Sequence, residues 1–237
     1  MRIVLLMVLF IPGVVAWNWD THEAIITSVY YHLNDTWKEK LSLEHLQEGS
    51  VIPDKIFKDF SKHGFPEAID ETRHWLDQTK VFLARKDYAN ASISLGIASH
   101  YMGDSFAAPH SVAGEPYSLH KGYEDQASQD YFYASCLEQD LLLKDIIYTG
   151  SQQGSTWQDW LERHDPALPQ ASTREATLYV TAFALSFFDD TCHTFETHIE
   201  EAPFTFNVTT AIVLTIILLG IGWTSISLYR DLKDYGK

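Results

Sequence analysis

Residues 99–124 read SHYMGDSFAAPHSVAGEPYSLHKGYE and give this chain its most specific pattern. His100 and Asp104 are four positions apart on a predicted helix, so both side chains point to the same side of it. His120 and Glu124 repeat this spacing on the next predicted helix, and His110 lies in the loop between the two. The segment therefore gathers three imidazoles and two carboxylates within a short stretch of chain.

Nitrogen and oxygen ligands without thiolates suit zinc, with iron and manganese as alternatives. A single pair of a histidine and an acid at four-residue spacing is usually a surface pair. Two such pairs, with a further histidine between them, are instead typical of a metal site. The chain holds 11 histidines, and the other histidines in its second half match no such pattern.

The remainder of the sequence reads as helix almost throughout. Apolar residues at helical spacing predict helices at 23–33, 66–86, 88–105, 119–147 and 172–200. The last of these would begin at Ser172, with Glu175 completing a capping box. Residues 150–169 read as loop, with one short helix around Trp157 and Trp160. No strand pattern is found, so the expected fold is all-α, with a single helical domain.

The two ends of the chain read as export and membrane segments. Residues 1–16 combine Arg2, an apolar run and small residues before a cleavage site, as in a signal peptide; an uncleaved anchor is the alternative. Residues 207–229 predict a transmembrane helix, because residues 208–228 carry no charge and are long enough to cross a bilayer. A buried core helix is the alternative for this stretch. Residues 230–237 would form a cytoplasmic tail, leaving residues 17–203 as one domain outside the cytoplasm of a single-pass cell-membrane protein.

The formal net charge of the chain is −15, which disfavours nonspecific binding of nucleic acid. Two cysteines occur, Cys136 and Cys192. Export would permit a disulfide between them, but the sequence does not show that they meet.

The string HYMGD…PH…HKGYE resembles the core motif of the zinc-dependent phospholipase C family and of the related S1/P1-type nucleases. Members of that family begin their mature chain with a tryptophan whose free amine binds zinc. The predicted cleavage leaves WNWDTH at the N-terminus, so Trp17 matches that position. The resemblance extends over most of residues 17–124 and implies an all-α fold of the same type.

The resemblance implies three zinc ions. Asp54, His74, His100 and Asp104 would hold the first ion, and Asp54 could also act as general base. For this site His74 is preferred over His63, because an aromatic residue follows it and an acid lies three positions on. His110, His120 and Glu124 would hold the second ion. Trp17, His22 and Asp104 would hold the third, with Asp104 bridging two sites.

The expected function is therefore zinc-dependent hydrolysis of a phosphodiester. A phospholipid headgroup is favoured as substrate, because a membrane tether raises the effective concentration of lipid. An exported nuclease or nucleotidase is the alternative enzyme, with nucleic acid as its partner. A zinc-binding surface protein without catalysis is the third interpretation. The sequence gives no indication of the oligomeric state.

Overall fold

The structure, a computed structural model, describes residues 19–127, 137 and 141–191, and these residues fold as helices without strands. The all-α prediction is confirmed. Nine α-helices and three short helices of other types follow one another within the described ranges. They are α1 (Trp19–His32), α2 (Asp35–Lys38), α3 (Leu43–Ile52), the π-helix η1 (Pro53–Phe57), the 3₁₀ helix η2 (Phe60–Lys62), α4 (Glu67–Ala84), α5 (Tyr88–Asp104), the 3₁₀ helix η3 (Ala108–Ser111), α6 (Tyr117–Glu124), α7 (Leu143–Gly150), α8 (Gly154–Arg163) and α9 (Ala167–Phe187).

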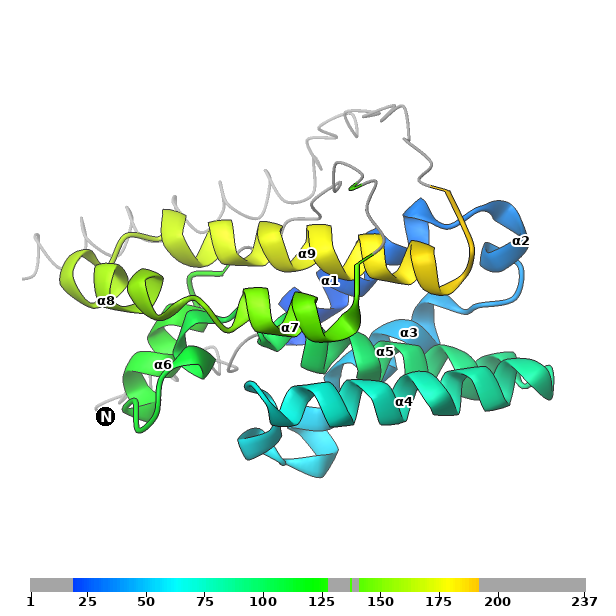
Figure 1. Cartoon of the computed structure of the whole chain (residues 1–237), viewed down its shortest axis with the longest axis horizontal. Coiled ribbons are helices and arrows are strands. Elements are labelled where there is room, and N and C mark those ends of the chain that lie inside the picture. Colours follow the sequence, from blue (N-terminus) through cyan, green and yellow to red (C-terminus); the bar gives the residue numbers. More distant parts are fainter. Residues whose placement is uncertain (1–18, 128–136, 138–140, 192–237) are drawn as a thin grey trace, which may run out of the picture. The chain divides into compact units, whose positions relative to one another are not determined.

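Helix α5 is the central helix of the domain. Thirteen of its 17 residues are buried, which matches its small and apolar sequence. It packs between α3 and α4, while α1 packs against α3 and α9. Figure 1 shows α4 and α5 running side by side, with α9 and α7 forming a second pair of neighbouring helices. The last turn of α5 carries His100 and Asp104, so both side chains start from the interior of the protein.

Two glycines allow α3 and α5 to touch through their backbones. A Cβ atom added at Gly96 would lie 2.2 Å from the carbonyl oxygen of Leu46, and one at Gly49 would lie 2.1 Å from that of Ile93. Neither distance is compatible with a side chain, so glycine is required at both positions. This close approach brings the carbonyl of Ser50 to the ring of His100.

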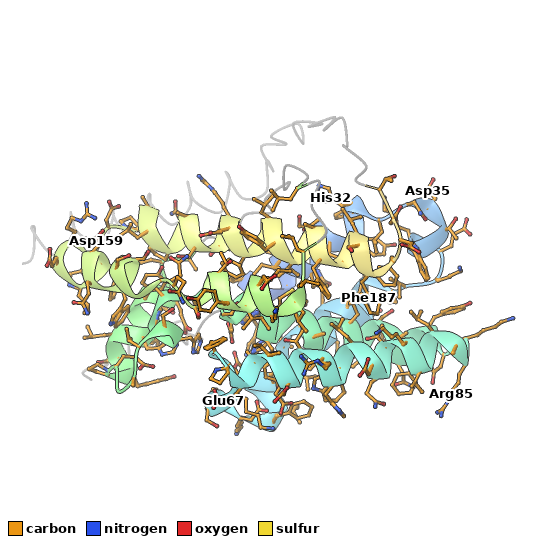
Figure 2. The ribbon with its side chains drawn as sticks, in the orientation of Figure 1. His32, Asp35, Glu67, Arg85, Asp159 and Phe187 are labelled. Carbon is orange, nitrogen blue, oxygen red and sulfur yellow. The ribbon has the colours of Figure 1, made fainter. Side chains whose placement is uncertain are left out.

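A tight turn returns the chain from α4 to α5. Lys86 adopts a left-handed conformation, with φ of 59°, and ends α4. Asp87 then caps α5 by accepting a hydrogen bond from the backbone N–H of Asn90. In Figure 2 the labels Glu67 and Arg85 mark the beginning and the end of α4. The two predicted helices at 66–86 and 88–105 are thus confirmed within a few residues.

The predicted helix at 119–147 is wrong in its length. Helix α6 ends at Glu124, where Asp125 caps it, and α7 begins only at Leu143. The cause is local: Pro116 fixes the start of α6, and the backbone turns after Glu124 rather than continuing. The expected short helix around Trp157 and Trp160 is confirmed as α8.

The last predicted helix, at 172–200, begins too late and ends too late. Helix α9 starts at Ala167, so Ser172 lies inside it and is not its N-cap. The Ser172 hydroxyl is instead buried and hydrogen-bonded to the hydroxyl of Tyr123 at 2.8 Å. After Phe187 the chain turns, with φ of 52° at Asp189, and the Asp190 carboxylate accepts hydrogen bonds from Asn34.

Several predictions concern residues outside the described ranges. These are the signal peptide at 1–16, Trp17, Cys136 and Cys192, the transmembrane helix at 207–229 and the tail at 230–237. Among the residues that the structure does describe, no helix has both the length and the apolar character needed to cross a bilayer.

Candidate metal centre

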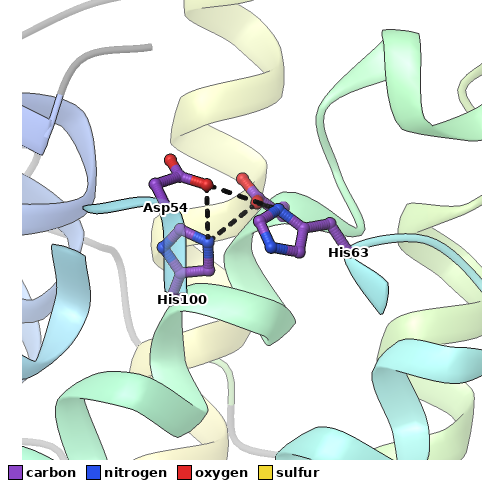
Figure 3. Close-up of side chains that lie close together, drawn as sticks. Asp54, His63 and His100 are labelled. Atoms are coloured by element: carbon purple, nitrogen blue, oxygen red, sulfur yellow. Dashed lines mark ion pairs between the residues drawn. The ribbon is translucent and has the colours of Figure 1, made fainter. Parts of the chain in front are cut away.

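Four side chains from three parts of the chain converge beside the end of α5. Asp54 comes from η1, His63 directly follows η2, and His100 and Asp104 belong to α5. One potential ligand atom from each residue lies within 4.8 Å of the others. Figure 3 shows Asp54, His63 and His100 directed toward a common point. We call these four residues the first group.

Asp104 is at the centre of the first group. Its Oδ2 atom lies 2.7 Å from Nδ1 of His63 and 3.1 Å from Nε2 of His100. Asp54 Oδ1 is 3.6 Å from each of the same two nitrogen atoms. Both imidazoles are almost fully buried, whereas the Asp54 side chain keeps 20% of its surface exposed. Asp54 is therefore the member of this group that faces solvent.

The structure brings His63 into the first group and leaves His74, the preferred histidine, outside it. His74 is exposed on α4, where its ring contacts that of Trp75. The buried stripe of α4 consists of Ala68, Thr72, Leu76 and Thr79, and position 74 falls on the opposite face. His63 is 1% exposed and lies among the other members of the first group.

The ring of His100 is held in one orientation by the backbone of α3. Its Nδ1 atom is 2.8 Å from the carbonyl oxygen of Ser50. Because a carbonyl oxygen only accepts, Nδ1 carries the hydrogen and donates it. In the neutral ring, Nε2 is then the atom with the lone pair, and it points at the carboxylates of Asp54 and Asp104.

His63 has a carboxylate behind it that sequence reasoning missed. Its Nε2 atom is 3.4 Å from Oδ1 of Asp59, on the side away from Asp104. The other oxygen of Asp59 accepts a 2.8 Å hydrogen bond from the Tyr101 hydroxyl. Burial raises the pKa of that hydroxyl, and the hydrogen bond to Asp59 raises it further. Asp59 therefore orients the ring of His63 with the Nδ1 atom facing inward.

A second group consists of His110, His120 and Glu124, whose potential ligand atoms also lie within 4.8 Å of one another. His110 belongs to η3, and the other two residues belong to α6. Oε1 of Glu124 is 2.6 Å from Nε2 of His120 and 3.7 Å from Nε2 of His110. On the other side of this ring, Nδ1 of His120 lies 2.9 Å from Oε1 of Glu115, another residue without a predicted role. The second predicted ligand set is brought together as a whole.

Asp104 also links the two groups to His22. Its Oδ2 atom is 3.8 Å from Nε2 of His110, while its Oδ1 atom is 3.2 Å from Nε2 of His22. The rings of His22 and His100 stack with centroids 3.9 Å apart. The two oxygens of one carboxylate thus face different histidines, as expected for a bridging residue. Trp17, the other predicted member of the third site, lies outside the described residues.

The crowding of charges in this centre shifts the pKa values of its members. Burial alone would raise the pKa of Asp104, but the imidazoles of His100, His22 and His110 lower it well below its usual range. For His110, burial lowers the pKa to about 3, and Asp104 offsets this only in part. The metal-free centre therefore has an ionised aspartate beside a neutral His110.

The pKa values of His120 and Glu124 are both raised, whereas those of Asp104 and His110 are lowered. Burial would lower the pKa of His120, but hydrogen bonds to Glu124 and Glu115 raise it to about 9. Burial raises the pKa of Glu124 to about 7, against the opposing effect of His120. When His120 is protonated, its Nε2 atom donates a hydrogen bond to Oε1 of Glu124 at 2.6 Å. A metal ion bound here would have to displace that proton.

The residues fit zinc by both chemistry and geometry. Nε2 of His100 is buried and makes no hydrogen bond, although two carboxylates face it. A buried nitrogen without a hydrogen bond, beside two carboxylates, is a place where one cation can bind all three side chains. Imidazole nitrogens and carboxylate oxygens, with no thiolate among them, form a donor set that zinc accepts.

A pocket of about 420 Å³ opens beside both groups. It is of the size of a small-molecule site. Members of each group form part of its wall, and aromatic side chains form much of the rest. Its lining residues are Trp19, Asp54, Phe60, His63, Asp104, His110, Glu115, Tyr117, His120 and Glu124.

Helices around a buried cluster of histidines and carboxylates, next to a pocket, define a metal-dependent enzyme of the all-α class. The family model for zinc dependent phospholipase C matches residues 21–165, which is more than half of the 237 residues, and the chain belongs to this family. The family is one of hydrolases, and zinc-dependent phosphodiesterase activity fits the centre described above. A comparison with curated proteins gave no match.

Proposed function

We propose that the chain hydrolyses the phosphodiester of phospholipid headgroups, as a phospholipase C does, with zinc held by the first and second groups. One observation carries the proposal. The two groups share a pocket whose other side chains are aromatic or acidic. Such a pocket offers zinc ligands for the phosphate and a separate surface for the headgroup attached to it.

The composition of the pocket favours a lipid over a nucleic acid. Its ten lining residues, all within the described part of the chain, include no lysine and no arginine. Single-stranded nucleic acids are bound in basic grooves that follow the phosphate backbone. The rings of Phe60 and Tyr117, together with the carboxylate of Glu115, instead suit a positively charged alkylammonium headgroup.

Zinc bound by these residues would act as a Lewis acid that lowers the pKa of a water molecule and offsets the charge of the phosphoryl oxygens. Asp54 lies in the pocket wall and is partly exposed, so its carboxylate can accept the proton of the attacking water. The water oxygen bonds to phosphorus and the bond from phosphorus to the glycerol oxygen breaks. The glycerol oxygen takes up a proton from solvent, Asp54 returns its proton to solvent, and diacylglycerol and the phosphorylated headgroup are released.

The proposal includes a location at the cell membrane. Residues 1–16 would direct export, residues 207–229 would cross the bilayer, and residues 230–237 would remain in the cytoplasm. A charge-free stretch at 208–228 supports the crossing, because about 20 apolar residues span the hydrocarbon core. The helical domain would then work outside the cytoplasm, close to lipid of the same membrane.

The test compares two substrates under two metal conditions. Purified full chain, either zinc-loaded or treated with a chelator, is added to phosphatidylcholine vesicles and, separately, to single-stranded DNA and RNA. We expect release of phosphorylated headgroup from the vesicles, lost with the chelator and restored by zinc. The Asp54→Asn variant should lose most of this activity, because Asp54 belongs to the first group and also lies in the pocket wall.

The nuclease interpretation and the non-catalytic interpretation each predict a different result in the same assay. Zinc-dependent cleavage of nucleic acid without headgroup release would identify the nuclease alternative. Bound zinc with no hydrolysis of either substrate would identify a zinc-binding protein without catalysis. Either result would overturn the proposal.

A further inference from the structure

Four of the nine large hydrophobic side chains that are exposed within the described residues lie in one short segment. They are Ile56 at 63%, Phe57 at 41%, Phe60 at 59% and Phe65 at 45% exposure. This segment, residues 55–65, runs through η1 and η2 and is called the rim segment below. Exposed apolar side chains are ordinary when scattered, but a cluster marks an interaction site.

The rim segment borders the mouth of the pocket. Phe60 belongs to the pocket lining and is also more than half exposed. At the other end of the segment, the ammonium group of Lys55 lies 4.7 Å from the ring centre of Trp19, another lining residue. Tyr117, 72% exposed, lines the same pocket from α6. Whatever covers the rim segment therefore also faces the opening of the pocket.

The outward charges of the rim segment are positive, in a chain whose net charge is −15. Lys55 and Lys58 are exposed, and Lys62 lies at the edge, where it pairs with Glu71 at 2.6 Å. The acidic member, Asp59, is turned inward to Tyr101 and His63. Lysines interleaved with aromatic and aliphatic side chains are typical of surfaces that lie in the interface of a bilayer.

We propose that the rim segment docks on a bilayer containing anionic lipid and thereby holds the mouth of the pocket against the lipid headgroups. Ile56 and Phe60, the two most exposed of the four side chains, would enter the headgroup region, while Lys58 contacts anionic headgroups. The choice of a bilayer over a protein partner rests on the proposed lipid substrate. Docking itself needs neither zinc nor catalysis.

Hydrogen exchange of the full chain tests the docking directly. The protein is placed in phosphatidylcholine vesicles, in vesicles that also contain phosphatidylserine, and in detergent, all with chelator present. We expect slower exchange across residues 55–65 in the phosphatidylserine vesicles than in the other two, and a smaller difference at high salt. Because chelator is present, this result does not depend on whether the chain is a phospholipase.

A pair of matched variants provides a second measurement. Ile56→Ser/Lys58→Glu changes the rim segment, and Val81→Ser/Lys86→Glu makes the same kinds of change in the last turn of α4 and just after it. The control is close, because Val81 is exposed and both lysines are exposed residues in a left-handed conformation. The rim variant should hydrolyse lipid in phosphatidylserine-containing vesicles at least about tenfold more slowly, since each lysine near such a surface contributes about a fivefold effect. Hydrolysis of a water-soluble phosphodiester should be unchanged in both variants.

Two results would overturn the proposal. The first is equal exchange of residues 55–65 in all three settings. The second is exchange of these residues that is already slow in detergent and becomes slower as the protein concentration rises. That result would make the rim segment an interface between protein molecules. Docking without any phosphodiester hydrolysis would instead uphold this inference and overturn the proposed function.

Discussion

Replacing Asp104 by asparagine should disable the whole metal centre rather than one site. The substitution keeps the size of the side chain and removes its charge. Asp104 Oδ2 lies within 3.8 Å of nitrogen atoms of His63, His100 and His110, and Oδ1 lies 3.2 Å from His22. The change therefore affects both groups and His22 at once.

The size of the effect follows from the burial of Asp104, whose side chain is only 2% exposed. Removing one partner from a buried set of charges costs about 3–5 kcal/mol. At about 1.4 kcal/mol for each factor of ten, zinc binding should weaken by roughly 100-fold to 4,000-fold. Asp104→Asn should therefore lose more zinc than His100→Ala or any other single histidine variant.

The assay is zinc per chain, measured by mass spectrometry after dialysis, together with affinity from competition with a chromophoric chelator. Asp77→Asn is the matched control, because Asp77 is an exposed aspartate on α4 with 62% of its side chain accessible. Circular dichroism checks that each variant keeps its helices. A folded Asp104→Asn variant with normal zinc content and affinity would refute the bridging role.

Three further outcomes are expected. His63→Ala should lose zinc and hydrolysis, while His74→Ala keeps both; the reverse result in metal analysis would restore His74 as the ligand. Gly96→Ala should lower the free energy of unfolding in urea by about 3 kcal/mol, because its Cβ would meet the Leu46 carbonyl at 2.2 Å. Gly154→Ala, with nothing within 4 Å, should be neutral or stabilising, and equal effects of the two changes would contradict this reasoning. Zinc binding near pH 7.5 should release protons, because the pKa of His120 is raised to about 9. Calorimetry in buffers of different ionisation enthalpy measures this release, which should decline above pH 9; a constant value would argue against a protonated His120.

Much of the centre could be predicted because its ligands lie on regular helices. His100 with Asp104, and His120 with Glu124, follow from four-residue spacing, and the structure brings each pair together. His63 could not be found in this way, because it follows the short helices η1 and η2, which have no apolar periodicity to fix their faces. His74 was preferred because of its sequence neighbours alone. The buried stripe of α4 contains Thr72 and Thr79, so the apolar pattern of the sequence did not show that position 74 lies off it.

The residues that orient the histidine rings could not be predicted, for a different reason. Asp59 and Glu115 act through the far side of an imidazole, and nothing in the local sequence marks that role. The contact of Gly49 and Gly96 depends on two helices whose pairing the sequence did not specify. The predicted helix bounds were wrong where a tertiary contact overrides a capping pattern. Ser172 lies inside α9 and its hydroxyl is hydrogen-bonded to that of Tyr123, so it does not cap the helix.

Helix α5 serves as the middle of the hydrophobic interior and as the carrier of His100 and Asp104. A ligand that binds only the native state stabilises it in proportion to the logarithm of its free concentration. The lifetime of this protein should therefore follow the supply of zinc. When zinc is scarce, the metal-free protein would be inactive and would also be degraded faster by proteases. Scarcity of the metal would therefore reduce the amount of enzyme as well as the activity of each molecule.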